Sequence, residues 1–257
     1  MTILFNEIVF GPIKSRRLGV SLGVNLLPLH GKWCNFDCIY CECGFNKDGK
    51  GDLCLPTKEE VEFALEAKLK NHDSRIGNID TITFSGNGEP TLHPKFSSII
   101  GKTLELREQF APQAKVSVLT NGSRIGVKDV AEALLKVDNA IIKIDSALEG
   151  SVYAIDRPMF NYSVENMVGM LAPFKGKFVL QTMFLRGESP DGVIDNTTLE
   201  EVEAWYKLVG RIDPREIMIY TIDRETPLKS LQKVSVDQME EIAAPLREQG
   251  YKVSVSG

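Results

Sequence analysis

The chain lacks the features that mark membrane-spanning and secreted proteins. No apolar run approaches the ~20 residues that a helix needs to cross a bilayer. Residues 1–7 lack the basic start and the small-residue cleavage site of a signal peptide. Positive charge is not in excess, because the net charge is -5 and the pI is near 5.4, which argues against nonspecific binding of nucleic acids. We therefore expect a cytoplasmic globular protein without a membrane partner.

Cysteine is scarce and unevenly placed. The sequence has five cysteines, and four of them fall between positions 34 and 43. An odd number gathered in one short stretch does not suit a disulfide framework. Reduced thiols that serve a metal site in the cytosol are the better explanation.

The stretch from Trp33 to Cys41 places Cys34, Cys38 and Cys41 at the spacing C-x3-C-x2-C. Three soft donors in one loop can converge on a single metal centre. A structural zinc site needs four ligands, whereas an iron-sulfur cubane takes one cysteine per iron, so three cysteines leave one iron open. The alternatives are buried core cysteines or a zinc site with Cys43 as fourth ligand, although one residue between two ligands is a tight spacing.

Hydrophobic periodicity predicts an α/β fold in which strands and helices alternate. Residues 10–19 read as turn-rich. Strands are expected at residues 20–27, 79–84, 116–119, 140–144, 178–184, 217–220 and 252–256, and helices at 57–71, 94–107, 127–135, 164–171, 198–209 and 235–248. Capping boxes mark two of the helix starts, at Thr57 with Glu60 and at Thr198 with Glu201. Because right-handed crossovers place the helices on one face, we predict an open β/α barrel of about six parallel strands, as a single domain over residues 1–257.

Polar residues follow several of these strands, where the site of such a barrel lies. Residues 85–90 form a glycine-rich turn, in which glycines let the backbone approach a ligand closely. Thr120 and Asn121 end the next strand. Lys143 and Asp145 lie on a strand that is otherwise apolar and point to the same side by alternation; the alternative is that they face solvent or pair with each other.

The cysteine stretch resembles the signature of the radical S-adenosylmethionine (SAM) superfamily, including the aromatic residue before the last cysteine, Tyr40. The resemblance implies a [4Fe-4S] cluster held by Cys34, Cys38 and Cys41, with SAM chelated by the fourth iron. It implies an enzyme that reductively cleaves SAM to a 5'-deoxyadenosyl radical, which abstracts a hydrogen atom from a substrate. An external one-electron reductant, flavodoxin- or ferredoxin-like, is implied as a partner.

The same resemblance assigns residues to parts of SAM. Tyr40 is placed by the adenine, and a polar residue near Lys143 or Asp145 by the ribose, although lysine replaces the serine that is frequent there. Arg186 would neutralise the SAM carboxylate, with a surface arginine as the alternative. The remaining assignments are to the methionine part of SAM. The resemblance implies that its amine is bound by a GGEP-like motif, here Gly86, Asn87, Gly88 and Glu89. It also implies that the methionine carboxylate lies beside Thr120 and Asn121.

A narrower resemblance is to iron-sulfur oxidoreductases related to the wyosine-tRNA synthesis enzyme. It covers residues 11–19, the cysteine loop, and residues 88–91, 155–158 and 220–224. It implies RNA as the candidate substrate, although only Cys43 and Cys54 remain for a second cluster. Five cations are candidates for phosphate contacts, with ordinary solvated charge as the alternative: Lys14, Arg16, Arg17, Arg157 and Arg224.

The alternative function is a noncatalytic iron-sulfur or zinc protein that uses the cysteines for electron transfer or structure.

Overall fold

The computed structural model describes residues 3–48, 54–72, 77–190 and 192–257. The chain divides into two compact units. We call residues 4–34 and 46–140 the amino-terminal unit, and residues 1–3, 35–45 and 141–257 the carboxyl-terminal unit. The two are described separately.

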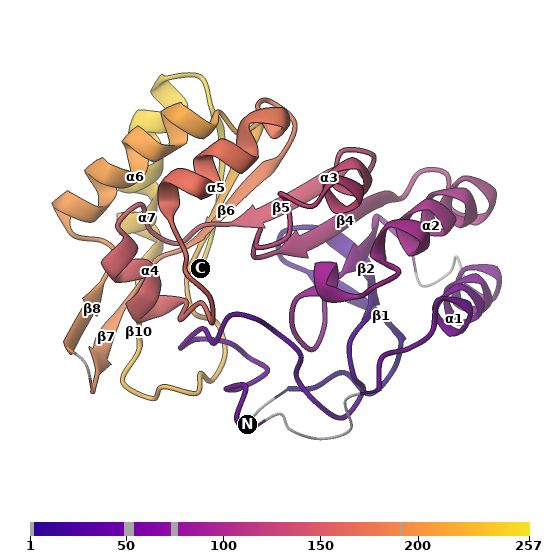
Figure 1. Ribbon diagram of the computed structural model, residues 1–257. Helices are drawn as coiled ribbons and strands as arrows, with labels where there is room; N and C mark the ends of the chain where they lie inside the picture. The colour runs from indigo at the N-terminus through magenta and orange to yellow at the C-terminus, as the bar shows by residue number, and fades with distance from the viewer. Residues whose placement is uncertain (1–2, 49–53, 73–76, 191) are drawn as a thin grey trace. The chain divides into compact units, whose positions relative to one another are not determined.

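The described residues of the amino-terminal unit form strands β1 to β4 and helices α1 to α3 (Figure 1). Strand β1 (Val9–Ser15) pairs antiparallel with β2 (Gly19–Val24), which is parallel to β3 (Thr81–Phe84), and β3 is parallel to β4 (Lys115–Thr120). Helix α2 (Phe96–Phe110) packs between α1 (Lys58–Lys70) and α3 (Lys128–Leu134) and contacts β4. A short 3-10 turn, η2 (Pro90–Leu92), follows the glycine-rich loop.

Helix α1 begins and ends within one residue of its predicted bounds, 57–71. Thr57 caps the helix, and its side chain accepts from the backbone N–H of Glu60 while the Glu60 carboxylate accepts from the backbone of Thr57, so the predicted capping box is confirmed. Val61, Leu65 and Leu69 form the buried face. Local side-chain chemistry therefore sets where this helix begins.

The carboxyl-terminal unit contains a parallel sheet in the order β5-β6-β9-β11, with bounds Asn139–Lys143, Val179–Met183, Glu216–Tyr220 and Lys252–Ser256. The division between the units falls inside β5. A small antiparallel sheet has the order β10-β7-β8, with bounds Gln232–Lys233, Leu185–Ser189 and Gly192–Asp195. The helical elements of this unit are α4 (Glu149–Ile155), α5 (Val164–Leu171), η3 (Ala172–Phe174), α6 (Leu199–Ile212) and α7 (Val236–Glu248).

Each unit has a core of strand and helix side chains. Phe84 of β3 and Phe96 of α2 meet edge to face, with ring centroids 6.5 Å apart. In the carboxyl-terminal unit, Trp205 of α6 packs edge to face on Phe184 at 5.3 Å, and both side chains are buried. These contacts fix the strand ends that carry the polar residues. Parallel strands with packed helices in both units confirm the predicted α/β class.

Several elements differ from the sequence prediction. Residues 10–19 are not simply turn-rich, because most of them form β1 and its hairpin with β2; a register irregularity between Phe10 and Ile13, at Gly11-Pro12, disguises the strand. Strands β7, β8 and β10 and helix α4 were not predicted; α4 has no side-chain cap at its start. The second capping box is half present: Thr198 accepts from the Glu201 N–H, but the Glu201 carboxylate accepts from Ser146 and Ser151 instead.

Candidate active site

The loop after β3 holds the backbone immediately before the first cysteine. The Trp33 N–H donates to the Asn87 carbonyl at 2.9 Å, and the Trp33 carbonyl accepts from the Glu89 N–H at 3.1 Å. These two bonds form an isolated parallel β-bridge between Trp33 and Gly88 of the glycine-rich turn. The position of Cys34 is therefore set by the loop that the sequence predicted to be near a ligand.

The two glycines of this loop are required by the protein's own packing. A Cβ on Gly88, whose φ is +137°, would lie 1.9 Å from the Trp33 carbonyl oxygen. A Cβ on Gly86 would lie 2.3 Å from the Asn25 side-chain oxygen. Packing within the chain therefore requires both glycines, and the expected contact of this turn with a ligand stays a prediction.

Asn87 is a scaffold residue in this loop. Its side chain is fully buried and donates to the carbonyls of Phe5 and Pro28 at 2.9 and 2.8 Å, while its oxygen accepts from the Phe5 N–H at 2.8 Å. Its own N–H donates to the Asn25 side chain at 3.2 Å. The Asn87 amide thus binds backbone from two earlier segments of the amino-terminal unit.

Glu89 joins the ends of β3 and β4. The carboxylate is buried and accepts from the Thr91 N–H and hydroxyl at 3.0 and 2.5 Å, from the Thr120 hydroxyl at 2.7 Å and from the Asn121 N–H at 2.7 Å. Burial raises the pKa of Glu89, and these hydrogen bonds oppose that shift. The network brings Glu89, Thr120 and Asn121 together, as expected for residues at neighbouring strand ends.

The side chain of Asn121 faces Cys34. Its Nδ2 lies 3.8 Å from the Cys34 Sγ, and its Oδ1 accepts from the Ser123 N–H at 2.9 Å. The amide therefore presents its donor end to a predicted cluster ligand.

The second part of the cysteine loop belongs to the carboxyl-terminal unit, where residues 155–159 hold it. Ile39 N–H donates to the Ile155 carbonyl at 2.9 Å, and Asp37 N–H donates to the Asp156 carbonyl at 3.1 Å. Met159 N–H donates to the Asn35 carbonyl at 2.9 Å. The segment 155–158, which entered the sequence argument only as part of a resemblance, therefore supports the backbone around Cys38.

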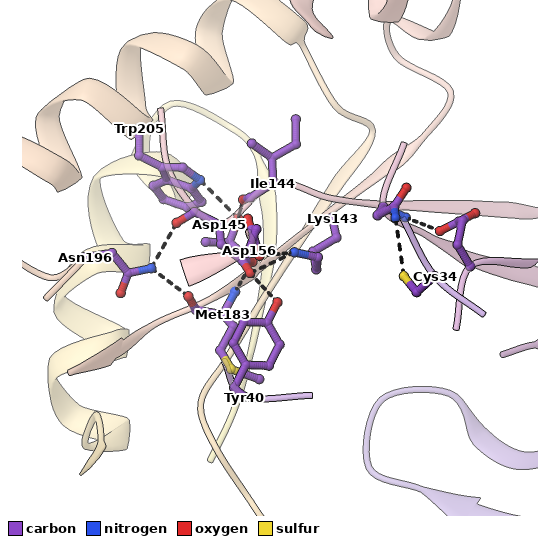
Figure 2. A network of polar contacts seen from close by, with 12 residues as sticks. Cys34, Tyr40, Lys143, Ile144, Asp145, Asp156, Met183, Asn196 and Trp205 are labelled. Atoms are coloured by element: carbon purple, nitrogen blue, oxygen red, sulfur yellow. Dashed lines mark hydrogen bonds and ion pairs between the residues drawn. The ribbon is translucent and has the colours of Figure 1, made fainter. Parts of the chain in front are cut away.

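A buried charge network lies beside this loop (Figure 2). The Lys143 ammonium is 3.1 Å from Asp145 Oδ2 and also donates to Asp156. The Tyr40 hydroxyl donates to the same oxygen of Asp145, and the Met183 N–H donates to the other at 2.9 Å. Of the two open interpretations of Lys143 and Asp145, pairing with each other is the one that the structure shows.

Asp156 is a site residue that sequence reasoning missed. Burial raises its pKa to about 7, while Lys143 opposes and Asp145 adds to the shift. Burial lowers the pKa of Lys143, but the two aspartates outweigh it and raise that pKa well above its usual value. Burial, with Asp145 adding, also raises the pKa of Tyr40. At neutral pH the ammonium and the phenol keep their protons, and the Asp156 carboxyl titrates because its pKa is about 7.

Arg186 lies in the small antiparallel sheet. It lies in β7, beyond the end of β6, and its Nε is 3.1 Å from Asp195 Oδ2. Its Nε and Nη2 both donate to the Thr197 hydroxyl, at 2.9 and 2.6 Å. The guanidinium is engaged in the β7–β8 hairpin.

The cysteines of the motif are divided between the units, with Cys34 in the amino-terminal unit and Cys38 and Cys41 in the carboxyl-terminal unit. All five cysteines lie in the described part of the chain and are thiols. Within either unit, the described residues show no group of three His, Cys, Asp or Glu side chains at a metal site. Among these residues, no helix combines the length and apolarity needed to span a bilayer.

Comparison with known proteins identifies the family. The family model described as the Radical SAM superfamily matches residues 29–196, more than half of the chain. The chain belongs to the radical SAM superfamily. The match contains the cysteine loop, the glycine-rich turn and the Lys143 network, so the predicted superfamily resemblance is confirmed.

Two relatives extend the comparison of this radical SAM protein. It is 31% identical to the UPF0026 protein MJ1312 of Methanocaldococcus jannaschii, over 94% of this chain and 71% of that protein. It is 30% identical to a protein of Brachyspira hyodysenteriae named GTPase Obg, over 90% of this chain. The chain spans only 32% of the length of the Brachyspira protein.

Solved structures support the fold. A radical SAM methyltransferase from Sphaerobacter thermophilus superimposes with a TM-score of 0.69 at 15% identity, covering 92% of this chain and 65% of that one. Archaeal TYW1 gives a TM-score of 0.53 at 14% identity, covering 89% of this chain and 71% of that one. The predicted open β/α barrel is the fold of this superfamily, and superfamily members use a [4Fe-4S] cluster, SAM and an external reductant. The donor set fits that cluster, because it offers three thiols and directs an N–H donor at one of them.

Proposed function

We propose that this radical SAM protein is an enzyme that cleaves SAM reductively and abstracts a hydrogen atom from a substrate. The observation that carries the proposal is the C-x3-C-x2-C motif, whose first cysteine is fixed by Trp33 and contacted by the Asn121 amide. Cys34, Cys38 and Cys41 would hold three irons of the cluster. The three cysteines and the residues proposed for SAM would belong to one catalytic domain, residues 1–257.

When bound, the cluster supplies one electron to SAM, which yields the 5'-deoxyadenosyl radical. The chain's own residues would position SAM. The glycine-rich turn is proposed to bind the methionine amine through Gly86, Asn87, Gly88 and Glu89. The backbone of the turn would make this contact, because the Asn87 side chain already binds Phe5 and Pro28. Thr120 remains proposed for the carboxylate. Asn121 belongs to the same strand end, and its side-chain donor faces Cys34.

The charge network is proposed for the nucleoside of SAM. Tyr40 is the candidate for the adenine, and Lys143 and Asp145 are the candidates for the ribose hydroxyls. The buried network fixes all three side chains before a ligand binds, which reduces the entropy lost on binding. Arg186 is proposed for the SAM carboxylate, and its guanidinium would have to exchange its contacts with Asp195 and Thr197 for that role.

Anaerobic reconstitution with iron and sulfide tests the proposal. We expect about four irons per chain, SAM-dependent formation of 5'-deoxyadenosine under dithionite, and loss of both in Cys34→Ala, Cys38→Ala and Cys41→Ala. Cys54→Ala is the matched control, because Cys54 is exposed and outside the motif. Wild-type levels of iron and 5'-deoxyadenosine in a motif variant would refute the proposal.

Cys43→Ala separates the alternative metal site from the proposed one. A zinc site with four thiolates would lose its metal in this variant, whereas a cluster held by the three motif cysteines keeps its iron. One zinc per chain without cleavage of SAM in the wild type would establish the noncatalytic alternative. Because the thiols must stay reduced to bind iron, a reducing compartment, the cytoplasm, is part of the proposal, with a flavodoxin- or ferredoxin-like protein as electron donor.

RNA is the proposed substrate class, supported by the narrower sequence resemblance to enzymes related to wyosine-tRNA synthesis. Lys14 and Arg16 are exposed in the β1–β2 hairpin. Arg224 forms an ion pair with Glu42 at 2.7 Å, and Arg157 stacks on Phe45. Binding of total tRNA, measured with and without Lys14→Gln/Arg16→Gln, tests the class: an affinity that is unchanged in the variant, or no binding by the wild type, removes the support from these cations.

A further inference from the structure

The backbone of Asn121 is fixed in position by a buried network. Asn121 directly follows β4, and its N–H donates to Glu89 at 2.7 Å. The Glu89 carboxylate is itself held by Thr91 and Thr120. The backbone of Asn121 therefore has little freedom to move.

The orientation of the amide is also determined. The Asn121 Oδ1 accepts from the Ser123 N–H at 2.9 Å, and the Nδ2 is 3.8 Å from Cys34 Sγ. If the amide were turned over, its NH2 group would face the Ser123 N–H and its oxygen would face the sulfur. The NH2 donor would then face the Ser123 N–H donor, and the amide oxygen would face the sulfur without a donor between them. Only the observed orientation therefore satisfies both neighbours.

Cys34 is fixed from its own side. The preceding residue, Trp33, forms two backbone hydrogen bonds with the glycine-rich loop. The Cys34 carbonyl accepts from the Asn46 side chain at 3.2 Å. Both partners of the N–H···S contact are thus held independently of the contact itself.

A donor aimed at a cluster sulfur has a defined electrostatic effect. When a cluster with thiolate ligands accepts an electron, negative charge on its sulfurs increases, and an N–H donor stabilises the reduced state more than the oxidised state. Donors to ligand sulfurs therefore raise the reduction potential. A higher potential lets a given external reductant reduce a larger fraction of the protein.

We propose that Asn121 is a positioning residue that donates a hydrogen bond to the Cys34 thiolate and raises the reduction potential of the cluster. This inference rests on the proposed function, in which Cys34 is a cluster ligand. It assigns the Asn121 side chain to Cys34 rather than to the SAM carboxylate, whereas the backbone of Asn121 serves Glu89.

The test is a redox titration of reconstituted, SAM-free protein, followed by electron paramagnetic resonance. Asn121→Leu keeps the shape of the side chain and removes the donor. Asn121→Asp keeps an acceptor for the Ser123 N–H and places an oxygen against the sulfur. We expect both variants to need a more negative potential, with the larger shift in Asn121→Asp; a tenfold change in the ratio of reduced to oxidised cluster would appear as about 59 mV for one electron. Asn161→Ala, an exposed asparagine of the carboxyl-terminal unit, is the control.

Binding of SAM provides the second readout. Wild-type SAM affinity with a shifted potential supports the inference. An unchanged potential, with or without weaker SAM binding, overturns it. If Asn121→Leu does not take up iron, Asn121→Gln, which keeps an amide donor, is titrated against Asn121→Asp, and equal potentials in this pair also overturn the inference. If the wild type itself assembles no four-iron cluster, it is the proposed function that fails.

Discussion

Lys143 is the single cation of the described network that also contains Asp145 and Asp156, so its removal gives the most informative perturbation. The substitution Lys143→Met keeps the length and the apolar stem of the side chain and deletes the ammonium. Asp145 would retain the donors Tyr40 and Met183. Asp156 would lose the ammonium that now binds it.

The size of the effect follows from burial. The side chain of Lys143 is 14% exposed, and those of Asp145 and Asp156 are 0% and 3% exposed. Removal of one partner from a buried ion pair costs about 3–5 kcal/mol. For a chain of this size that corresponds to a fall in Tm of about 6–20 °C. Because Lys143 lowers the pKa of Asp156, its removal raises that pKa further, and protonation of Asp156 is expected to limit the loss more at pH 6 than at pH 8.5.

Urea unfolding of reconstituted protein at pH 6 and pH 8.5 measures this loss. The chain has two tryptophans, and in a Trp33→Phe background the remaining one, Trp205, is buried on Phe184 and reports the carboxyl-terminal unit. Lys229→Met is the matched control, because Lys229 and its partner are each 69% exposed. An exposed pair is worth about 0–1 kcal/mol. A loss in Lys143→Met no larger than that of the control would refute the reasoning.

Two further predictions concern the network and the glycine-rich loop. Asp156→Asn should flatten the pH dependence of stability. In the wild type, burial raises the pKa of Asp156 from 3.8 to about 7, so the stabilisation from its protonated form is complete below pH 4 and is lost as the pH rises through 7. The same dependence of the urea midpoint on pH in both proteins would contradict this prediction. Gly88→Ala should cost about 1–3 kcal/mol and lower the iron content, since the new Cβ meets the Trp33 carbonyl at 1.9 Å. Its control is Gly101→Ala, where no atom lies within 4 Å of the new Cβ and a helix gains about 0.5–1 kcal/mol; equal stability and iron content in the two variants would contradict the steric argument.

Sequence patterns predicted the elements whose signals are local. Helix α1 begins where its capping box indicates, and β11 has the predicted bounds Lys252–Ser256. The β1–β2 hairpin was missed because Gly11-Pro12 interrupts the alternation at a register irregularity. The small sheet of β7, β8 and β10 was missed because two of its strands are separated in the chain by α6 and β9, and pairing at that distance leaves no periodic signal.

The glycine-rich turn shows a second limit. A glycine in the sequence indicates that a Cβ is not tolerated, but it does not say what occupies the space. At Gly86 and Gly88 the occupants are Asn25 and Trp33, which belong to the chain itself. The pattern therefore predicts a close approach at these positions but not which group approaches, and that is known only from the three-dimensional structure.

Metal ligands and the groups that tune them differ in how they can be found. Cys34, Cys38 and Cys41 were predicted because their spacing lies within one loop. The donor to the Cys34 sulfur comes from Asn121, 87 positions later, and the Tyr40 hydroxyl binds Asp145, 105 positions later. Potential and charge at the site depend on these distant partners, since hydrogen bonds to sulfur and nearby charges set both. Two proteins with the same cysteine spacing can therefore bind the same cluster and differ in how readily it is reduced, and here that difference is expected to reside in the residue after β4.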